Sequence, residues 1–407
     1  MRKKTYYGLP EDVFFCKRCV ISNQRPTSSV EFKHNINTKK KTMAFDDNGV
    51  CDACQSAVKK ESIDWKSRED QLIQLLDKYR RNDGSYDCLV PGSGGKDSAY
   101  QAHILKYKYG MNPLTYTWPP ILYTDYGYQN WKNWLEIGGF DNVTFKPNGQ
   151  TMKTLTKLAI ENIFHPFQTF FYGQKNLAPK VAAQMNIPLV FYGENEAEYG
   201  NPIADNNSSL RSKSIFSSKD MDNIYLAGVS VKELKEQHGL TVQDLNLFMP
   251  PTVDLITNSK IEVHYLGYYL NWIPQEVYYY AVENTGFKAR PFRTQGTYSK
   301  YSSIDDKIDD LHYYTTYIKF GIGRATYDAS QEIRNKHITR EEGVALVNKF
   351  DGEFPDKYFK DIMDYLEIDP EYFITELTDR FRSPHLWSLN DGWKLNHNVM
   401  GTGFRDE

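Results

Sequence analysis

One glycine-rich segment combines residue types that can hold phosphate groups. Residues 90–98 read Val-Pro-Gly-Ser-Gly-Gly-Lys-Asp-Ser and lie between a predicted strand and a predicted helix. Such a turn exposes backbone N–H groups beside the positive end of the helix dipole, which favours anions. The Walker pattern requires Ser or Thr where Asp97 stands, and the dinucleotide pattern requires glycine there. The segment therefore fits neither a Walker-type NTPase nor a nicotinamide enzyme.

Four of the five cysteines form two C-x-x-C pairs, which is a pattern typical of metal sites. Cys16 and Cys19 form the first pair, and Cys51 and Cys54 form the second. Four thiolates can bind one tetrahedral zinc ion, and a long loop between the pairs costs little entropy. Redox-active pairs, a sulfur-carrying site and an iron–sulfur site are the alternatives. The fifth residue, Cys88, lies in a predicted strand and is expected to be a small buried hydrophobe.

Polar residues directly follow two predicted strands. In a doubly wound sheet, ligands gather at the carboxyl ends of the strands. We therefore expect Glu194 and Asn195 to contact a bound ligand or its metal ion. Asp125 follows another strand, and for this residue ligand contact and helix capping stay equal alternatives.

Arginine and histidine residues add candidates for binding a second substrate. Arg290 and Arg293 flank Pro291-Phe292, and arginine supplies planar donors for a phosphate or a carboxylate. Surface salt bridges are the alternative for both. His165 precedes a proline and has a pKa range suited to a general base, although a packed or capping role is the alternative.

Charge is unevenly distributed along the chain. Residues 1–60 hold twelve Lys and Arg against six Asp and Glu, whereas the whole chain has a formal net charge of −3. The run 39–41 is all lysine, and it is expected to be a solvated loop because no basic face continues beyond it. Nucleic-acid binding is thus unlikely on charge alone. The acidic residues of the segment 305–310 are expected to be solvated in the first turn of a helix.

Length and composition indicate a globular protein with more than one core. The chain has 407 residues, of which 40% are hydrophobic and 25% charged. No apolar run reaches the ~18 residues that a membrane helix needs. The first residues carry no apolar segment of the signal-peptide kind. A cytoplasmic location without membrane attachment is expected.

Alternating strands and helices predict an α/β fold with a doubly wound parallel sheet and helices on both faces. Strands are predicted at 86–90, at 114–118 or 121–124, at 142–146 and at 187–192, and helices at 65–81, 97–109, 129–137, 151–163 and 175–185. Beyond a strand-like run at 261–269, helices are predicted at 274–285, 304–320, 325–336, 339–350, 355–366 and 370–381. Three domains are expected: a cysteine-pair module (1–64), an α/β domain that carries the glycine-rich segment (65–260) and a mostly helical substrate or partner domain (261–407).

The segment Ser-Gly-Gly-Lys-Asp-Ser at 93–98 resembles the pyrophosphate (PP) loop of the ATP pyrophosphatases. These enzymes have a doubly wound sheet, cleave ATP between the α- and β-phosphates and adenylate a carbonyl or carboxylate oxygen. The resemblance implies that Ser93, Gly94, Gly95 and Ser98 cradle pyrophosphate. It also implies that Lys96 adds positive charge and that Asp97 helps to hold Mg²⁺, a cation that prefers oxygen ligands.

Nearly the full chain resembles the N-acetyl sugar amidotransferases of bacterial surface-polysaccharide biosynthesis, which make lipopolysaccharide O-antigen or nonulosonic acid sugars. The segments that carry this resemblance are YTDYGYQNW (123–131), GGFDN (138–142), HPFQ (165–168), GQKNLAPK (173–180), FYGENEAEYGNP (191–202), RPFRTQGTYSKY and GIGRATYDASQEIR within 290–335, and RSPHLW (382–387).

The resemblance implies a reaction and a partner. An acetamido group on a nucleotide-linked or acidic N-acetyl sugar would become an acetamidino group, with ATP converted to AMP and pyrophosphate. Lys96, Asp97, Glu194 and Asn195 are the expected catalytic residues. A separate glutaminase, like the glutaminase and cyclase pair of histidine biosynthesis, would supply ammonia, since Arg2 and the surroundings of Cys88 fit no glutaminase nucleophile.

Two rival interpretations remain. A thiolase-like tRNA-modifying enzyme also combines a PP-loop with cysteine pairs and a basic arm, and it requires a reactive cysteine near ATP. A zinc-ribbon binding protein with an inactive loop is the second rival. The complete motif from Ser93 to Ser98 argues against that second rival.

Overall fold

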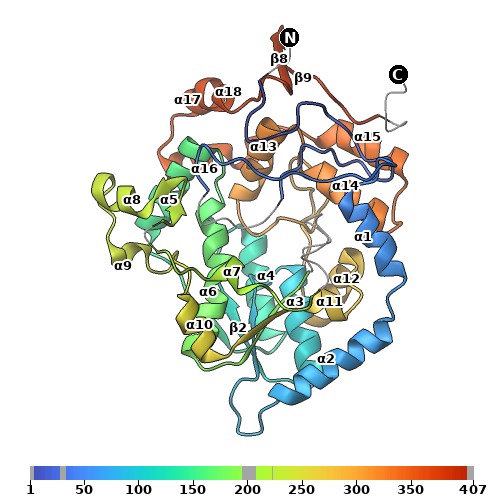
Figure 1. The fold of residues 1–407 in the computed structure, drawn as a ribbon, viewed down its shortest axis with the longest axis vertical. Helices are drawn as coiled ribbons and strands as arrows, with labels where there is room; N and C mark the ends of the chain where they lie inside the picture. The colour runs from blue at the N-terminus through green and yellow to red at the C-terminus, as the bar shows by residue number, and fades with distance from the viewer. Residues whose placement is uncertain (1–3, 28–33, 195–207, 222, 401–407) are drawn as a thin grey trace.

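A five-stranded parallel sheet lies at the centre of the α/β part of the chain (Figure 1). The structure is a computed structural model, and it describes residues 4–27, 34–194, 208–221 and 223–400. The strand order is β3-β2-β1-β4-β7, and every neighbouring pair is parallel. The strands are β1 (Cys88–Pro91), β2 (Pro113–Thr117), β3 (Asn142–Thr144), β4 (Leu189–Tyr192) and β7 (Glu262–Tyr265).

The strand order reverses at β1. The chain leaves β1 toward β2 and β3 on one side, and it returns to β4 and β7 on the other side. In sheets of this kind a crevice opens at the reversal, outside the carboxyl ends of the two central strands. The α/β class and the parallel sheet are thus confirmed. The second strand lies at 113–117, which is close to the first of the two predicted positions.

Helices cover both faces of the sheet because buried side chains alternate along its strands. Cys88 and Val90 face one hydrophobic cluster, whereas Leu89 faces another. The first cluster includes residues of α2 (Trp65–Tyr79), α3 (Lys96–His103) with its π-helical continuation (Ile104–Lys108), α4 (Asp125–Glu136), α11 (Leu266–Tyr269) and α12 (Pro274–Thr285). The second includes residues of α5 (Gly149–Ile163), α6 (Gln168–Gln184), α7 (Lys213–Phe216), α8 (Val231–Gln237), α9 (Val242–Leu245) and α10 (Val253–Ser259).

The C-terminal half is mostly helical, as predicted. Its helices are α13 (Ile308–Phe320), α14 (Arg324–Arg334), α15 (Arg340–Phe350), α16 (Asp356–Leu366), α17 (Pro370–Tyr372), a π-helical turn (Phe373–Leu377) and α18 (Thr378–Arg380). Sequence analysis did not anticipate α1 (Asp52–Glu61) or the hairpins β5-β6 (Tyr225–Leu226, Val229–Ser230) and β8-β9 (Trp387–Asn390, Gly392–Leu395). Among the described residues, no helix combines the length and hydropathy that crossing a membrane requires.

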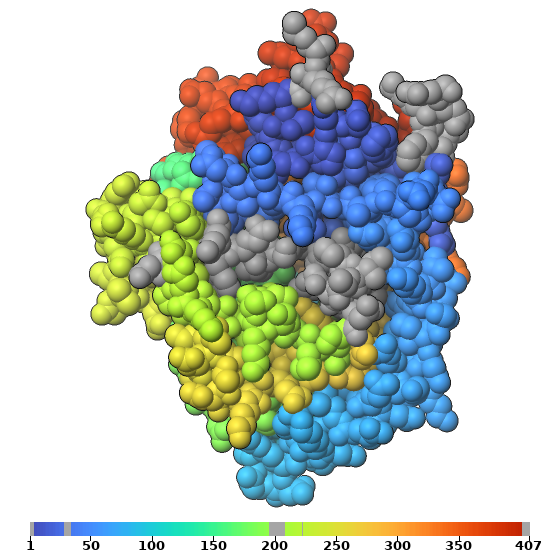
Figure 2. All heavy atoms as spheres, in the orientation of Figure 1, coloured from blue at the N-terminus to red at the C-terminus, as the bar shows by residue number. Residues whose placement is uncertain are grey.

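The two ends of the chain pack together. The blue N-terminal segment lies against the orange and red C-terminal elements in Figures 1 and 2. The Arg340 guanidinium donates to the carbonyls of Cys16 and Cys19, and the His385 ring bonds to Gln24. The sheet also continues past the boundary expected at residue 260, because β7 pairs with β4. The second and third expected segments therefore share one sheet, and the first expected segment packs against the third.

The glycine turn after β1 provides a test of the fold. Gly94 and Gly84 have nearly the same backbone angle, with φ of +83° and +84°. A Cβ on Gly94 would lie 2.5 Å from the Cα of Trp131 in α4, whereas nothing lies within 4 Å of a Cβ on Gly84. Gly84→Ala should cost about 1–2 kcal/mol of unfolding free energy from left-handed backbone strain alone. Gly94→Ala should cost a further ~1–3 kcal/mol because α4 must shift.

Urea unfolding of the two variants measures this difference. An equal loss of unfolding free energy in both variants would show that α4 does not press on the turn.

Candidate functional site

A cavity of about 710 Å³ opens at the carboxyl ends of β1 and β4. Its walls come from distant parts of the chain: the glycine turn after β1, residues 21–53 of the N-terminal segment, α6, and residues 299–337 around α13 and α14. Loops at a sheet reversal commonly hold ligands. The cavity is therefore the candidate functional site.

The glycine turn brings the first turn of α3 to the cavity. Gly95 is the N-cap residue of α3, and no side chain caps this helix end. A Cβ on Gly92 would lie 2.1 Å from the Cβ of Ser98, so the turn requires glycine there. The Ser98 hydroxyl donates to the Gly95 carbonyl at 3.0 Å. A tight turn that leads into an uncapped helix N-terminus is suited to binding an anion.

Three side chains add charge and hydrogen bonds to the turn. Lys96 is only 8% exposed, and its Nζ lies 2.6 Å and 2.8 Å from the two carboxylate oxygens of Asp97. The Asp97 side chain remains 41% exposed and lines the cavity. The Ser93 hydroxyl donates to the Asp305 carboxylate at 2.6 Å. The turn thus presents one buried cation and two carboxylates that a hydrated metal ion can reach.

The segment that carries Asp305 is held by hydrogen bonds to the connection before α4 and is not a solvated turn. The Asp306 carboxylate is 3% exposed and accepts from the backbone N–H groups of Ile121, Leu122 and Ile308. Burial raises the pKa of Asp306 to about 7, while these N–H donors oppose the shift. The expectation of a solvated acidic turn was wrong because Asp306 joins the β2–α4 connection to α13.

Sequence analysis singled out three residues that follow strands. The structure describes two of them, and one of these two lines the cavity. Glu194 follows β4 and lines the cavity close to Gly193. Asp125 is exposed in the first turn of α4 and is not among the cavity-lining residues. Asn195 lies outside the described residues.

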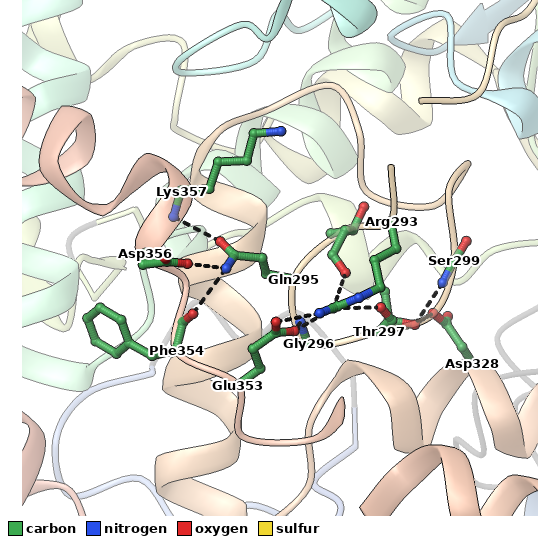
Figure 3. A network of polar contacts seen from close by, with 11 residues as sticks. Arg293, Gln295, Gly296, Thr297, Ser299, Asp328, Glu353, Phe354, Asp356 and Lys357 are labelled. Atoms are coloured by element: carbon green, nitrogen blue, oxygen red, sulfur yellow. Dashed lines mark hydrogen bonds and ion pairs between the residues drawn. The ribbon is translucent and has the colours of Figure 1, made fainter. Parts of the chain in front are cut away.

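Neither of the two predicted arginines belongs to the cavity lining. Arg293 makes a bidentate ion pair with Glu353 at 2.5 Å, which also accepts from the Gly296 N–H (Figure 3). Arg290 is 2% exposed, and its guanidinium has no hydrogen-bond partner among the described residues. In this structure Arg293 stabilises the loop between α12 and α13.

His165 lines the cavity together with a histidine that sequence analysis did not single out. The rings of His165 and His312 stack with centroids 4.9 Å apart, and the Nδ1 atoms of both rings are buried with no hydrogen-bond partner among the described residues. Burial lowers the pKa of His312 to about 3, and burial also lowers the pKa of His165. Both rings are therefore neutral at physiological pH.

Other cavity residues were missed because their roles depend on distant packing. Lys40, expected in a solvated loop, lines the cavity, whereas its neighbours Lys39 and Lys41 are exposed. Arg25 is 2% exposed and stacks over the Tyr327 ring at 5.3 Å. Only its place between two cysteine pairs could have drawn attention to Arg25.

The four paired cysteines meet in one buried cluster. Their sulfur atoms all lie within 4.8 Å of one another, with Cys16–Cys54 at 3.9 Å and Cys19–Cys51 at 3.7 Å. A tetrahedral zinc site with bonds of about 2.3 Å has sulfur–sulfur edges of about 3.8 Å. The cluster therefore fits a metal ion such as zinc. It has no open side toward the cavity, because all four residues are buried.

A segment near the C-terminus resembles a known protein family. Residues 295–400 match the family model described as LPS biosynthesis protein WbpG-like, C-terminal domain. The match supports a role in lipopolysaccharide biosynthesis as a biosynthetic enzyme. In addition, 81 residues are 28% identical to the uncharacterized protein MJ1599 of Methanocaldococcus jannaschii, over 20% of this chain and 28% of that protein. The chain thus matches under a third of that relative's length.

Replacing one clustered cysteine tests the metal site. Cys51→Ser should lower the bound metal from about one ion per chain to near zero, because the remaining thiolates leave the tetrahedron incomplete. Thermal unfolding of the variant should begin at a lower temperature. Elemental analysis and a melting curve measure both effects.

Cys88→Ala is the matched control, since Cys88 lies in β1 outside the cluster. Equal metal content in Cys51→Ser and Cys88→Ala would contradict the assignment.

Proposed function

We propose that the chain is an ATP-dependent amidotransferase that converts an acetamido group of an activated N-acetyl sugar to an acetamidino group. The observation that carries this proposal is the complete turn from Ser93 to Ser98, which opens into the cavity at the reversal of the sheet. The match to a lipopolysaccharide biosynthesis family agrees with a sugar substrate.

ATP would bind with its phosphates at the glycine turn. The N–H groups of the turn and Lys96 would hold the leaving pyrophosphate, and Asp97 would hold Mg²⁺. A neutral amide oxygen is a poor leaving group. Transfer of AMP to that oxygen gives an imidate that ammonia can attack, with AMP as the leaving group. The enzyme would accelerate the reaction by positioning the reactants and by stabilising the charge that develops in the transition state within an enclosed site.

The charges of the cavity agree with an anionic sugar substrate. Basic side chains from the N-terminal segment, α6 and α14 line it together, and they include Arg25, Lys175 and Arg324. Such side chains would bind the phosphates of a nucleotide-linked sugar or the carboxylate of an acidic sugar.

The nitrogen would come from a separate protein that hydrolyses glutamine. Four of the five cysteines form the metal cluster, and the fifth, Cys88, is fully buried in β1. Burial also raises the pKa of the Cys88 thiol. No cysteine is thus available as a glutaminase nucleophile or as a sulfur carrier near ATP. The same feature argues against a thiolase-like tRNA-modifying enzyme.

Product analysis with an Asp97 variant tests the proposal. Wild-type protein with ATP, Mg²⁺, ammonium and a panel of nucleotide-linked N-acetyl sugars should form AMP, pyrophosphate and a sugar in which NH replaces the acetamido oxygen. Asp97→Asn should lower the rate of amidine formation by about 10²–10³-fold, because it removes the negative charge that would hold Mg²⁺ at the phosphates.

Asp254→Asn, an exposed change in α10, is the matched control and should keep the wild-type rate. Formation of ADP, or unchanged sugars with AMP release stimulated by tRNA, would overturn the proposal.

A further inference from the structure

A small second pocket adjoins the main cavity at Lys319 in α13. Its volume is about 20 Å³, which is room for about one water-sized molecule. Its wall combines apolar side chains, including Tyr7, Ile163 and Phe381, with polar and basic ones. Lys319 lines both the pocket and the main cavity. A molecule in the small pocket would therefore lie beside the Lys319 side chain.

The Lys319 amine is held inside the protein without a carboxylate partner among the described residues. The side chain is 5% exposed, and its Nζ donates to the Ile163 carbonyl at 2.7 Å. The rings of Tyr7 and Phe320 lie 4.9 Å and 5.2 Å from this atom. A buried ammonium with only one acceptor and two rings is poorly solvated, so the neutral amine is favoured.

The groups around this amine are cationic or neutral. Lys40 and His34 face it from the N-terminal segment, His165 from the loop after α5, and His312 from its own helix. Burial, with a smaller contribution from Lys40, lowers the pKa of Lys319 to about 7. The same positive surroundings lower the pKa of both stacked histidines and disfavour any further cation.

We propose that Lys319 is the proton acceptor for the nitrogen nucleophile, which reaches this end of the cavity as uncharged ammonia. This inference rests on the proposed function. The pocket has the size of ammonia, and the positive surroundings exclude ammonium. His165 and His312 line the main cavity together with Lys319.

The step balances as a substitution at the adenylated carbon. Ammonia forms the new C–N bond and gives a tetrahedral intermediate with a positive nitrogen. One N–H proton passes to the neutral Nζ of Lys319. The C–O bond to AMP then breaks, AMP leaves with the electron pair, and the amidine remains. Lys319 later loses its proton to solvent.

Two variants of Lys319 separate proton acceptance from a purely electrostatic role. Lys319→Met keeps the side-chain volume and removes the base, whereas Lys319→Arg keeps a positive charge that cannot be deprotonated. Both should lower ammonia-dependent product formation by about 10²-fold or more. Sugar-dependent exchange of pyrophosphate into ATP, which reports adenylation alone, should fall less than about threefold because Lys319 would act only after adenylation.

The pH dependence gives a second readout. Lys319 accepts a proton only when its amine is neutral. At saturating free ammonia the wild-type rate should therefore rise as pH increases through about 7 and then level off. The Lys319→Met variant should lack this rise. Lys394→Met, an exposed change in the β8-β9 hairpin, is the control, and melting curves verify folding.

The outcomes distinguish this inference from the proposed function. If both variants keep the wild-type exchange of pyrophosphate into ATP but lose product formation, the result would support Lys319 as the proton acceptor. Wild-type product formation in Lys319→Met or Lys319→Arg would overturn that role and leave the amidotransferase intact. Absence of exchange in the wild-type protein would overturn both.

Discussion

The close contact between the glycine turn and α4 is the constraint on which the position of the helical half at the cavity depends. Gly94 has no side chain, so the turn packs directly on the backbone of Trp131. Asp305 then bonds to Ser93 of the same turn, and Asp306 joins the start of α13 to the connection before α4. These contacts attach the helical half of the chain to the carboxyl end of β1. A bulkier residue at position 94 would separate the glycine turn from α13 and its side chains.

The cavity is shared by segments that are far apart in the sequence. The cysteine cluster joins two stretches of the N-terminal segment, which place Arg25 and Lys40 in the cavity wall, and α15 holds this segment through Arg340. A metal ion in the cluster would therefore act at a distance, because the cluster lies next to the stretches that carry these basic side chains. The α14 helix, within the region that matches the lipopolysaccharide biosynthesis family, forms the opposite wall. Substrate binding would thus depend on both ends of the chain.

Local patterns predicted the parallel sheet, most helices, the glycine turn and the four-cysteine cluster, because each depends on nearby residues or on fixed spacing. Features that depend on long-range packing were not predictable from one sequence. Arg293 was expected to bind substrate, yet Glu353 occupies its guanidinium. His312 and Lys319 read as ordinary helix residues until α13 is placed against α5. The strand β7 belongs to the sheet because it pairs with β4. The sequence pattern changes near residue 260, and this change suggested a domain boundary instead of a further strand of the same sheet.

The central claim is that the acetamido oxygen is activated by transfer of AMP before nitrogen replaces it. An N-acetyl sugar labelled with heavy oxygen in its acetamido carbonyl tests this most directly. If the oxygen attacks the α-phosphate, the label must leave on AMP, and mass spectrometry of the released nucleotide should find it there in step with amidine formation. Label in inorganic phosphate with ADP as the nucleotide, or label that remains entirely in the sugar while ATP is consumed, would contradict the account.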